Sequence, residues 1–234
     1  MERVKLSARL AAAAALVKGD TLCDIGCDHG YLPVFLCEAG RLHRAVAADK
    51  SPGSLDKARR LIEERKLDHI IETRLGDGLA PVAPGEASVC CIAGMGGMNI
   101  ISILEARPET AAAFRQLILS PNRDHAALRM FLHRAGFRIN NEQAVYERGV
   151  IYFIIDASPG AEPAYDDIGY MFGAVLLERG DPVLKQYIEA ELERTQRLLA
   201  SFNEGGVPER LAQYAAQCQK SLEIISTCKI TDRN

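Results

Sequence analysis

Short apolar runs alternate with amphipathic segments along the first 155 residues. The apolar runs predict strands at residues 21–25, 43–48, 70–75, 87–93 and 114–119. Apolar positions at helical spacing predict helices at residues 5–17, 31–38, 55–67, 97–104 and 124–135. This alternation favours a parallel, doubly wound α/β sheet with right-handed crossovers.

The pattern changes after the fifth strand. Three further runs predict a terminal strand and a hairpin, at residues 137–140, 143–146 and 150–155. The sequence Ser-Pro-Gly-Ala-Glu-Pro at residues 158–163 then indicates a boundary. We therefore expect one domain over residues 1–160 and a second over residues 161–234.

The second domain has a helical pattern. A long helix begins at Asp181, the chain turns at Gly205-Gly206, and a second helix runs to Cys228. Apolar residues recur along both helices at steps of three and four. The pattern predicts a helical hairpin, either a short antiparallel coiled coil or a two-helix cap on the sheet.

The loop after the first strand carries the clearest chemical signal. It reads Asp-Ile-Gly-Cys-Asp-His-Gly at residues 24–30. Gly26 permits a tight turn, and Gly30 allows the next helix to approach a ligand. Asp28 stands where a dinucleotide-binding turn has a glycine, and its charge repels phosphates. A turn without a ligand is the alternative, but the loop favours a cationic ligand without phosphate, such as S-adenosylmethionine.

Further loops also follow strands. They contain Asp49, Gly76-Asp77-Gly78, Gly94-Met95-Gly96-Gly97 and Pro121-Asn122. The carboxyl ends of parallel strands share one edge, where ligands bind. We expect Asp24 to hold an α-ammonium group, Asp49 a ribose diol and Asp77 the adenine amine, although turn-capping roles stay open. The loop at residues 94–97 leaves room for a bulky methyl acceptor, with Met95 lining it.

The composition of the chain limits its possible partners and its cellular location. The chain has 234 residues, 48% of them apolar, a net charge of −3 and a pI near 6.0, so any RNA contact must use local basic patches. The longest bland run, residues 11–17, is too short to cross a membrane, and we expect a cytoplasmic protein. Seven cysteines lack zinc-binding spacing, so we expect buried thiols and no metal.

Several of these strings together resemble the TrmK family of bacterial tRNA (adenine-N1)-methyltransferases. They include Lys-Leu-Ser-x-Arg-Leu at residues 5–10, the loop at residues 24–33, Gly-Asp-Gly-Leu at 76–79, Ile-Ala-Gly-Met-Gly-Gly at 92–97, and Leu-Ile-Leu-x-Pro-Asn at 117–122. Three positions depart from the family pattern, namely Cys27, Gly30 and Ser120. At position 120 the family commonly has Gln. The resemblance implies a Rossmann-like class I methyltransferase sheet with a C-terminal helical hairpin. It also implies methyl transfer from S-adenosylmethionine to N1 of adenine 22 in tRNA.

The resemblance and the loops together give a set of candidate residues. The catalytic candidates are Asp28, His29, Tyr31 and Asn122. The donor-binding candidates are Arg9, Asp24, Gly26, Cys27, Asp28, Gly30, Asp49, Lys50, Gly76, Asp77, Gly78, Ala93, Gly94 and Met95. The tRNA-binding candidates are Arg123, Arg129 and Arg134.

Alternatives stay open for several of these residues. Asp28 either stabilises the cationic product or holds the donor's ammonium group. His29 and Tyr31 either contact the substrates or make local contacts, and Asn122 is a candidate for reading the adenine edge. Arg9 binds the donor carboxylate or a tRNA phosphate, or lies solvated on its helix.

Rival functions also fit part of the chain. A small-molecule methyltransferase would share the donor loops, but only 6% of the chain is aromatic and it has no Trp for a closed acceptor pocket. A non-catalytic nucleotide-binding scaffold would use the hairpin to dimerise, and a nicotinamide-dependent oxidoreductase conflicts with Asp28. The expected partner is tRNA, not a membrane, and the oligomeric state is open between a monomer and a weak homodimer.

Overall fold

A computed structural model describes residues 3–202 and 208–228 of the chain, in two compact units, Met1–Pro163 and Ala164–Asn234. The strands of the first unit are β1 (Thr21–Ile25), β2 (Arg44–Asp49), β3 (Ile71–Leu75), β4 (Val89–Met95), β5 (Gln116–Pro121), β6 (Phe137–Glu147) and β7 (Val150–Pro159). Its helices are α1 (Ala8–Leu16), α2 (Tyr31–Glu38), α3 (Pro52–Glu64), α4 (Gly97–Ala106), α5 (Pro108–Ala113) and α6 (His125–Arg134).

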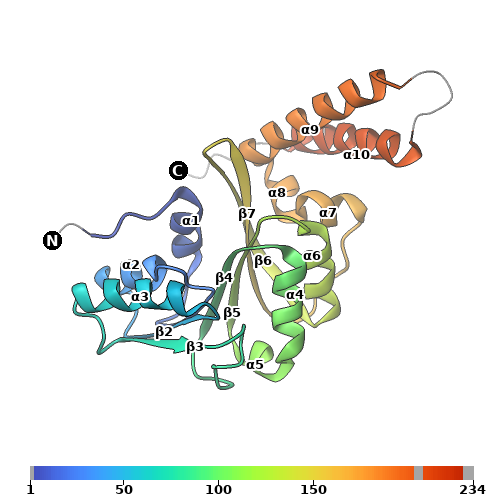
Figure 1. The fold of residues 1–234 in the computed structure, drawn as a ribbon. Helices are drawn as coiled ribbons and strands as arrows, with labels where there is room; N and C mark the ends of the chain where they lie inside the picture. The colour runs from blue at the N-terminus through green and yellow to red at the C-terminus, as the bar shows by residue number, and fades with distance from the viewer. Residues whose placement is uncertain (1–2, 203–207, 229–234) are drawn as a thin grey trace. The chain divides into compact units, whose positions relative to one another are not determined.

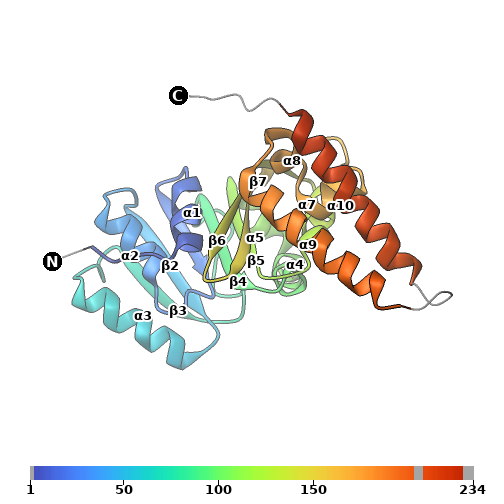
Figure 2. The same ribbon diagram turned by 90° about the horizontal axis from the view of Figure 1, so that it is seen from above.

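Among the described residues, the seven strands form one sheet in the order β3-β2-β1-β4-β5-β7-β6 (Figure 1). The first five strands pair in parallel, whereas β7 is antiparallel to both β5 and β6. Helices α1, α2 and α3 cover one face, and α4, α5 and α6 cover the other (Figure 2). This is the doubly wound α/β sheet that the sequence predicts.

The central strands are apolar because both of their faces are covered. All six residues of β5 are buried, as are Leu22–Ile25 of β1, whereas the edge strand β3 is mostly exposed or half-buried. Parallel strands buried on both sides read as continuous apolar runs, which is why the sequence located them. Six of the seven cysteines are buried and all seven are free thiols, as expected.

One buried polar group lies at the amino end of the strands. The carboxylate of Asp156 on β7 is fully buried and accepts hydrogen bonds from Lys18 Nζ at 2.9 Å and Gln116 Nε2 at 2.9 Å. Gln116 also donates to the carbonyl of Leu16 at 2.8 Å and accepts from the amide of Lys18 at 2.9 Å. These bonds fix the end of α1 to β5 and β7.

The terminal hairpin differs from the expectation. Strand β6 is continuous from Phe137 to Glu147, because a register irregularity between Ile139 and Asn141 lets it pass the expected break. Strand β7 extends to Pro159, into the expected boundary segment. The short helix α5 was not predicted.

The second unit is helical. It contains α7 (Asp167–Phe172), α8 (Ala174–Arg179), α9 (Pro182–Ala200) and α10 (Glu209–Thr227). The last two lie side by side, as the hairpin prediction requires (Figure 1). The predicted turn at Gly205-Gly206 lies outside the described residues. The short helices α7 and α8 were not predicted, and the separate functions of the two expected domains stay a prediction.

The buried positions of the helix pair follow part of the predicted apolar stripe. Leu184, Ile188 and Thr195 are buried on α9, and Cys218, Ser221 and Ile225 on α10. The Tyr214 hydroxyl also donates to Glu191 Oε2 at 3.0 Å. Leu198 and Phe202 are exposed, so the stripe is not buried along its full length.

Candidate functional site

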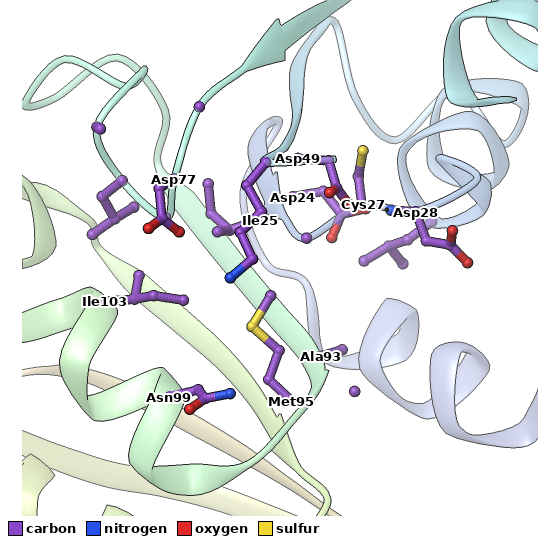
Figure 3. Close-up of a pocket in the computed structure, with 18 of the residues that line it drawn as sticks. Asp24, Ile25, Cys27, Asp28, Asp49, Asp77, Ala93, Met95, Asn99 and Ile103 are labelled. Atoms are coloured by element: carbon purple, nitrogen blue, oxygen red, sulfur yellow. Dashed lines mark hydrogen bonds between the residues drawn. The ribbon is translucent and has the colours of Figure 1, made fainter. Parts of the chain in front are cut away.

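A cavity of about 630 Å³ lies at the carboxyl edge of β1, β2 and β4 (Figure 3). Most of the predicted site residues line it: Arg9, Asp24, Gly26, Cys27, Asp28, His29, Tyr31, Asp49, Lys50, Gly76, Asp77, Gly78, Ala93, Gly94 and Met95. The loops converge because parallel strands end at the same edge.

The glycine turn after β1 is fixed by the neighbouring strand. The amides of Gly26 and Cys27 both donate to the carbonyl of Ala48, at 2.8 and 3.1 Å. Asp49 then accepts from the amide of Asp28 at 3.1 Å through Oδ2, and from the amide of Ser51 at 2.8 Å through Oδ1. Each carboxylate oxygen has a further lone pair, so Asp49 organises the turn and still has capacity for a diol.

Asp24 is a buried acid at the floor of the cavity. Burial, and after it the charge of Asp49, raise the pKa of Asp24 to about 7, while the Arg9 guanidinium opposes the rise. Such a carboxylate is costly unless a cation joins it, and a buried acid in a cleft is a typical binding-site feature. Asp24 is therefore poised to receive a cationic group.

Arg9 faces the same cavity from α1. Its Nη1 is buried without a hydrogen-bond partner in the described part of the chain, and the guanidinium lies 5.4 Å from the centre of the Tyr152 ring. A Cβ on Gly94 would lie only 2.9 Å from that Nη1, so Gly94 leaves room for the arginine. Arg9 is thus placed to bind an anionic group within the cavity, not solvated as one alternative held.

Met95 lies over the glycine turn. Its side chain extends from β4 into the cavity (Figure 3), and a Cβ on Gly26 would lie 2.1 Å from its methyl carbon. Gly26 also has φ = 72°, a left-handed conformation that side chains disfavour. The contact with Met95 and the left-handed backbone together explain why residue 26 is glycine.

Gly30 has a different role from the one expected. It is buried, does not line the cavity, and adopts φ = 69° at the start of α2. A Cβ there would approach the Cβ of Ala58 on α3 to 3.2 Å. Gly30 therefore permits close packing of two helices, and the prediction that it contacts the donor is wrong.

The opposite wall of the cavity was missed by sequence reasoning. It is formed by Asn99, Ser102, Ile103 and Ala106 of α4, followed by Arg107. Gly78, at φ = 54°, lies where a Cβ would meet Ile103 at 3.0 Å. The spacing of positions 99, 102, 103 and 106 puts them on one helix face, which is the signal that could have revealed the wall.

The mouth of the cavity carries a flat aromatic pair. The rings of His29 and Tyr31 stack with centroids 5.1 Å apart and an angle of 4° between their planes. Tyr31 is 40% exposed, and the Asp28 side chain is 64% exposed and points away from Asp24 and Asp49 (Figure 3). These three residues lie on a partly exposed rim of the cavity.

Asn122 joins two loops at this mouth. Its amide donates to the carbonyl of Met95 at 2.7 Å, and its Nδ2 donates to the carbonyl of Gly94 at 2.8 Å. It does not line the cavity. One N–H of the side-chain amide thus holds the end of β4, which indicates a positioning role. This bond does not use Oδ1 or the second N–H of the exposed side chain, so the adenine-edge role stays a prediction.

The three arginines predicted to bind tRNA differ in their burial. Arg129 is fully buried and pairs with the equally buried Glu142 at 2.7 Å, so the predicted contact of Arg129 with tRNA is wrong. Apolar neighbours on α6 conceal it, and the sequence shows no sign of its partner on β6. Arg123 and Arg134 are exposed, with loose ion pairs to Asp124 at 3.6 Å and Glu105 at 4.0 Å.

Comparison with known proteins identifies the family of this chain. A sequence model of the TrmK family, described as tRNA (adenine(22)-N(1))-methyltransferase, matches residues 22–226. The chain belongs to the TrmK family. As a member, it is an S-adenosylmethionine-dependent tRNA (adenine22-N1)-methyltransferase, as the sequence predicted.

Relatives cover nearly the whole TrmK chain. The tRNA (adenine(22)-N(1))-methyltransferase of Bacillus subtilis is 31% identical over 231 residues, which span 96% of this chain and 97% of the relative. The crystal structure of B. subtilis TrmK matches with a TM-score of 0.81 at 29% identity, covering 95% of this chain and 98% of that one. Streptococcus pneumoniae Sp1610, in complex with S-adenosyl-L-methionine, matches with a TM-score of 0.86 at 31% identity, covering 93% and 100%.

The described part of this TrmK chain has neither a membrane-spanning helix nor a metal-binding cluster of side chains. Within residues 3–202 and 208–228, no helix is both long enough and apolar enough to cross a bilayer. The same residues hold no cluster of three or more His, Cys, Asp or Glu side chains suited to a metal ion.

Proposed function

We propose that the cavity at the carboxyl edge holds the methyl donor through charges at fixed places. The buried, unpartnered Nη1 of Arg9 together with the buried carboxylate of Asp24 carries this proposal, because the amino-acid end of S-adenosylmethionine has both an anion and a cation. Arg9 would bind the donor carboxylate and Asp24 the α-ammonium.

The rest of the donor would follow the two further acids. Asp49 accepts hydrogen bonds from the ribose hydroxyls, and Asp77 accepts from the exocyclic amine of adenine. Lys50, Cys27 and Ala93 line the cavity beside them. Ile103 supplies an apolar surface for the adenine ring from α4.

When bound, the donor supplies an electrophilic methyl group on a sulfonium. N1 of the target adenine has its own lone pair, so the chain needs to orient the base but not to deprotonate it. The stacked rings of His29 and Tyr31 give the base a flat surface at the mouth. Asp28 stabilises the positive charge that develops on the adenine ring, and Asn122 holds the loop beneath.

The tRNA would approach the exposed mouth. Adenine 22 must leave its stack to enter the cavity, and Arg123 and Arg134 would contact backbone phosphates nearby. The proposal includes no metal ion, and we expect the rate with EDTA to equal the rate without it.

The deciding experiment incubates the protein with methyl-labelled S-adenosylmethionine and unmodified tRNA. We expect label in 1-methyladenine at position 22, and none in a tRNA with guanine at that position. Label elsewhere, or only in small molecules, would refute the proposal in favour of another methyltransferase. Donor binding without any transfer would support the scaffold.

The role of Asp28 needs a separate measurement. We expect Asp28→Asn to retain donor affinity by calorimetry. The single-turnover rate should fall, but by less than the roughly 10²–10³-fold loss of an enclosed electrostatic stabiliser, because the Asp28 side chain is 64% exposed. Asp20→Asn is a matched control, because Asp20 is an exposed acid at the opposite edge of the sheet. Equal loss of donor affinity and rate in Asp28→Asn would instead make Asp28 a donor ligand.

A further inference from the structure

The hairpin of β6 and β7 projects beyond the sheet. Strand β7 pairs with β5 only through residues 155–157, and residues 143–147 of β6 pair with 150–154 of β7. We call residues 143–154 the β6–β7 arm. Its tip lies three residues, roughly 10 Å, past the end of β5, at the same edge as the donor cavity (Figure 1).

The tip presents three exposed side chains. Tyr146 is 62% exposed and Val150 is 50% exposed. Arg148 is exposed between them and makes no hydrogen bond or ion pair with the residues that the structure describes. The arm therefore offers an exposed aromatic ring and an exposed cation two residues apart in the sequence.

The turn itself is unfavourable for arginine. Arg148 has φ = 51° and Gly149 has φ = 85°, the two left-handed positions of a tight hairpin turn. Asn-Gly is the sequence that favours such a turn, because asparagine tolerates this conformation better than long side chains do. Arginine at this position gives up local stability for a charge at the tip.

The arm is also attached to the donor cavity. Glu147 Oε2 accepts a hydrogen bond from the amide of Arg9 at 3.0 Å, and the Tyr152 ring lies under the Arg9 guanidinium. Arg9 is the residue proposed above to bind the donor carboxylate. The residues next to the turn and in the middle of the arm are thus held against α1, which gives the tip a fixed place beside the cavity.

We propose that the β6–β7 arm is a tRNA-binding element, in which Tyr146 stacks on a base and Arg148 pairs with a backbone phosphate next to the displaced adenine. The inference rests on the proposed function, since it places the RNA at this edge. An aromatic ring beside an arginine is the combination that binds unstacked nucleotides. Removing adenine from its stack leaves neighbouring bases with exposed faces for such a ring.

The substitution Arg148→Asn separates this role from a structural one. It creates an Asn-Gly turn, so we expect an equal or higher melting temperature, together with a KM for tRNA that rises several-fold. Loss of one phosphate contact lowers the slope of log affinity against log salt by about 0.7 to 0.9. Arg115→Asn, which removes an exposed arginine just before β5 at the far edge, should leave KM and slope unchanged.

Tyr146 is tested by paired variants. Tyr146→Ala should weaken tRNA binding by about tenfold, the scale of one base stacked on an aromatic residue, without changing the salt slope. Tyr146→Phe should restore the affinity, because the ring is kept. Both variants should bind S-adenosylmethionine as the wild type does in calorimetry.

The outcomes distinguish the arm from the underlying function. If the wild type methylates adenine 22 and the arm variants share its KM and salt slope, the arm does not bind tRNA. If Arg148→Asn and Arg115→Asn raise KM equally, only net charge matters and the inference is overturned. If the wild type methylates no tRNA, the proposed function itself has failed.

Discussion

The buried acid Asp24 makes a quantitative prediction about stability and binding. In the folded protein its pKa is raised to about 7 from an ordinary value of 3.8, chiefly by burial. Between these two values the folded state retains a proton that the unfolded chain releases. Stability therefore falls as the pH rises through this window, and the full cost is present above pH 7.

The substitution Asp24→Asn removes that cost. A shift of about 3 units corresponds to about 4 kcal/mol at 1.36 kcal/mol per unit, as an upper bound. We expect the variant without ligand to be more stable than the wild type, by roughly 2 to 3 kcal/mol more at pH 8 than at pH 5. In a unit of this size such a difference raises the melting temperature by about 5–10 °C.

The same substitution should damage donor binding. An amide does not neutralise an ammonium group, so we expect S-adenosylmethionine to bind Asp24→Asn at least about tenfold more weakly, the cost of one charge-assisted hydrogen bond. Urea unfolding at pH 5 and 8 and calorimetry at pH 8 measure the two effects, with Asp20→Asn as the exposed control. A variant that is less stable than the wild type at pH 8, or that binds the donor normally, refutes the reasoning.

Three further substitutions test the site and its support. Gly26→Ala strains a left-handed residue and displaces Met95; we expect donor affinity to fall about tenfold and stability by about 1 kcal/mol, measured by calorimetry and urea unfolding. Asn122→Ala releases the loop at the end of β4; kcat should fall while donor affinity changes little, and an unchanged kcat would remove its positioning role. Arg129→Ala leaves Glu142 buried without its cation, costing about 3–5 kcal/mol in urea unfolding, and the double change Arg129→Met with Glu142→Leu should recover most of it.

The fold could be predicted from sequence because its strongest signals are local. Apolar runs located the five parallel strands, and the glycine and aspartate loops marked their carboxyl ends. Those loops converge for a geometric reason, so the acids Asp24, Asp49 and Asp77 could be assigned to one cavity in advance.

Sequence reasoning failed where a residue's environment depends on a distant element. In the sequence, Arg129 is one of several basic residues that follow a loop. It is buried beside Glu142 only because α6 packs against β6. Gly30 reads as part of the ligand turn, yet its neighbour is Ala58 of α3. The wall formed by α4 was missed because Asn99 and Ser102 look ordinary until the helix is oriented toward the cavity.

The number of residues in helix α1 is constrained at both ends of the helix. Ser7 and Glu147 hold its first turn, and the chain just after it is fastened to Gln116 and Asp156, so both ends are set independently. Inserting or deleting one residue between them would rotate Arg9 by about 100° and shift it by about 1.5 Å along the axis. The exposed Ala11 and Ala15 are thus free to change identity, whereas Ala13 and Ala14 are buried in the core. A single-codon deletion in this run should abolish activity more completely than a substitution at either exposed alanine.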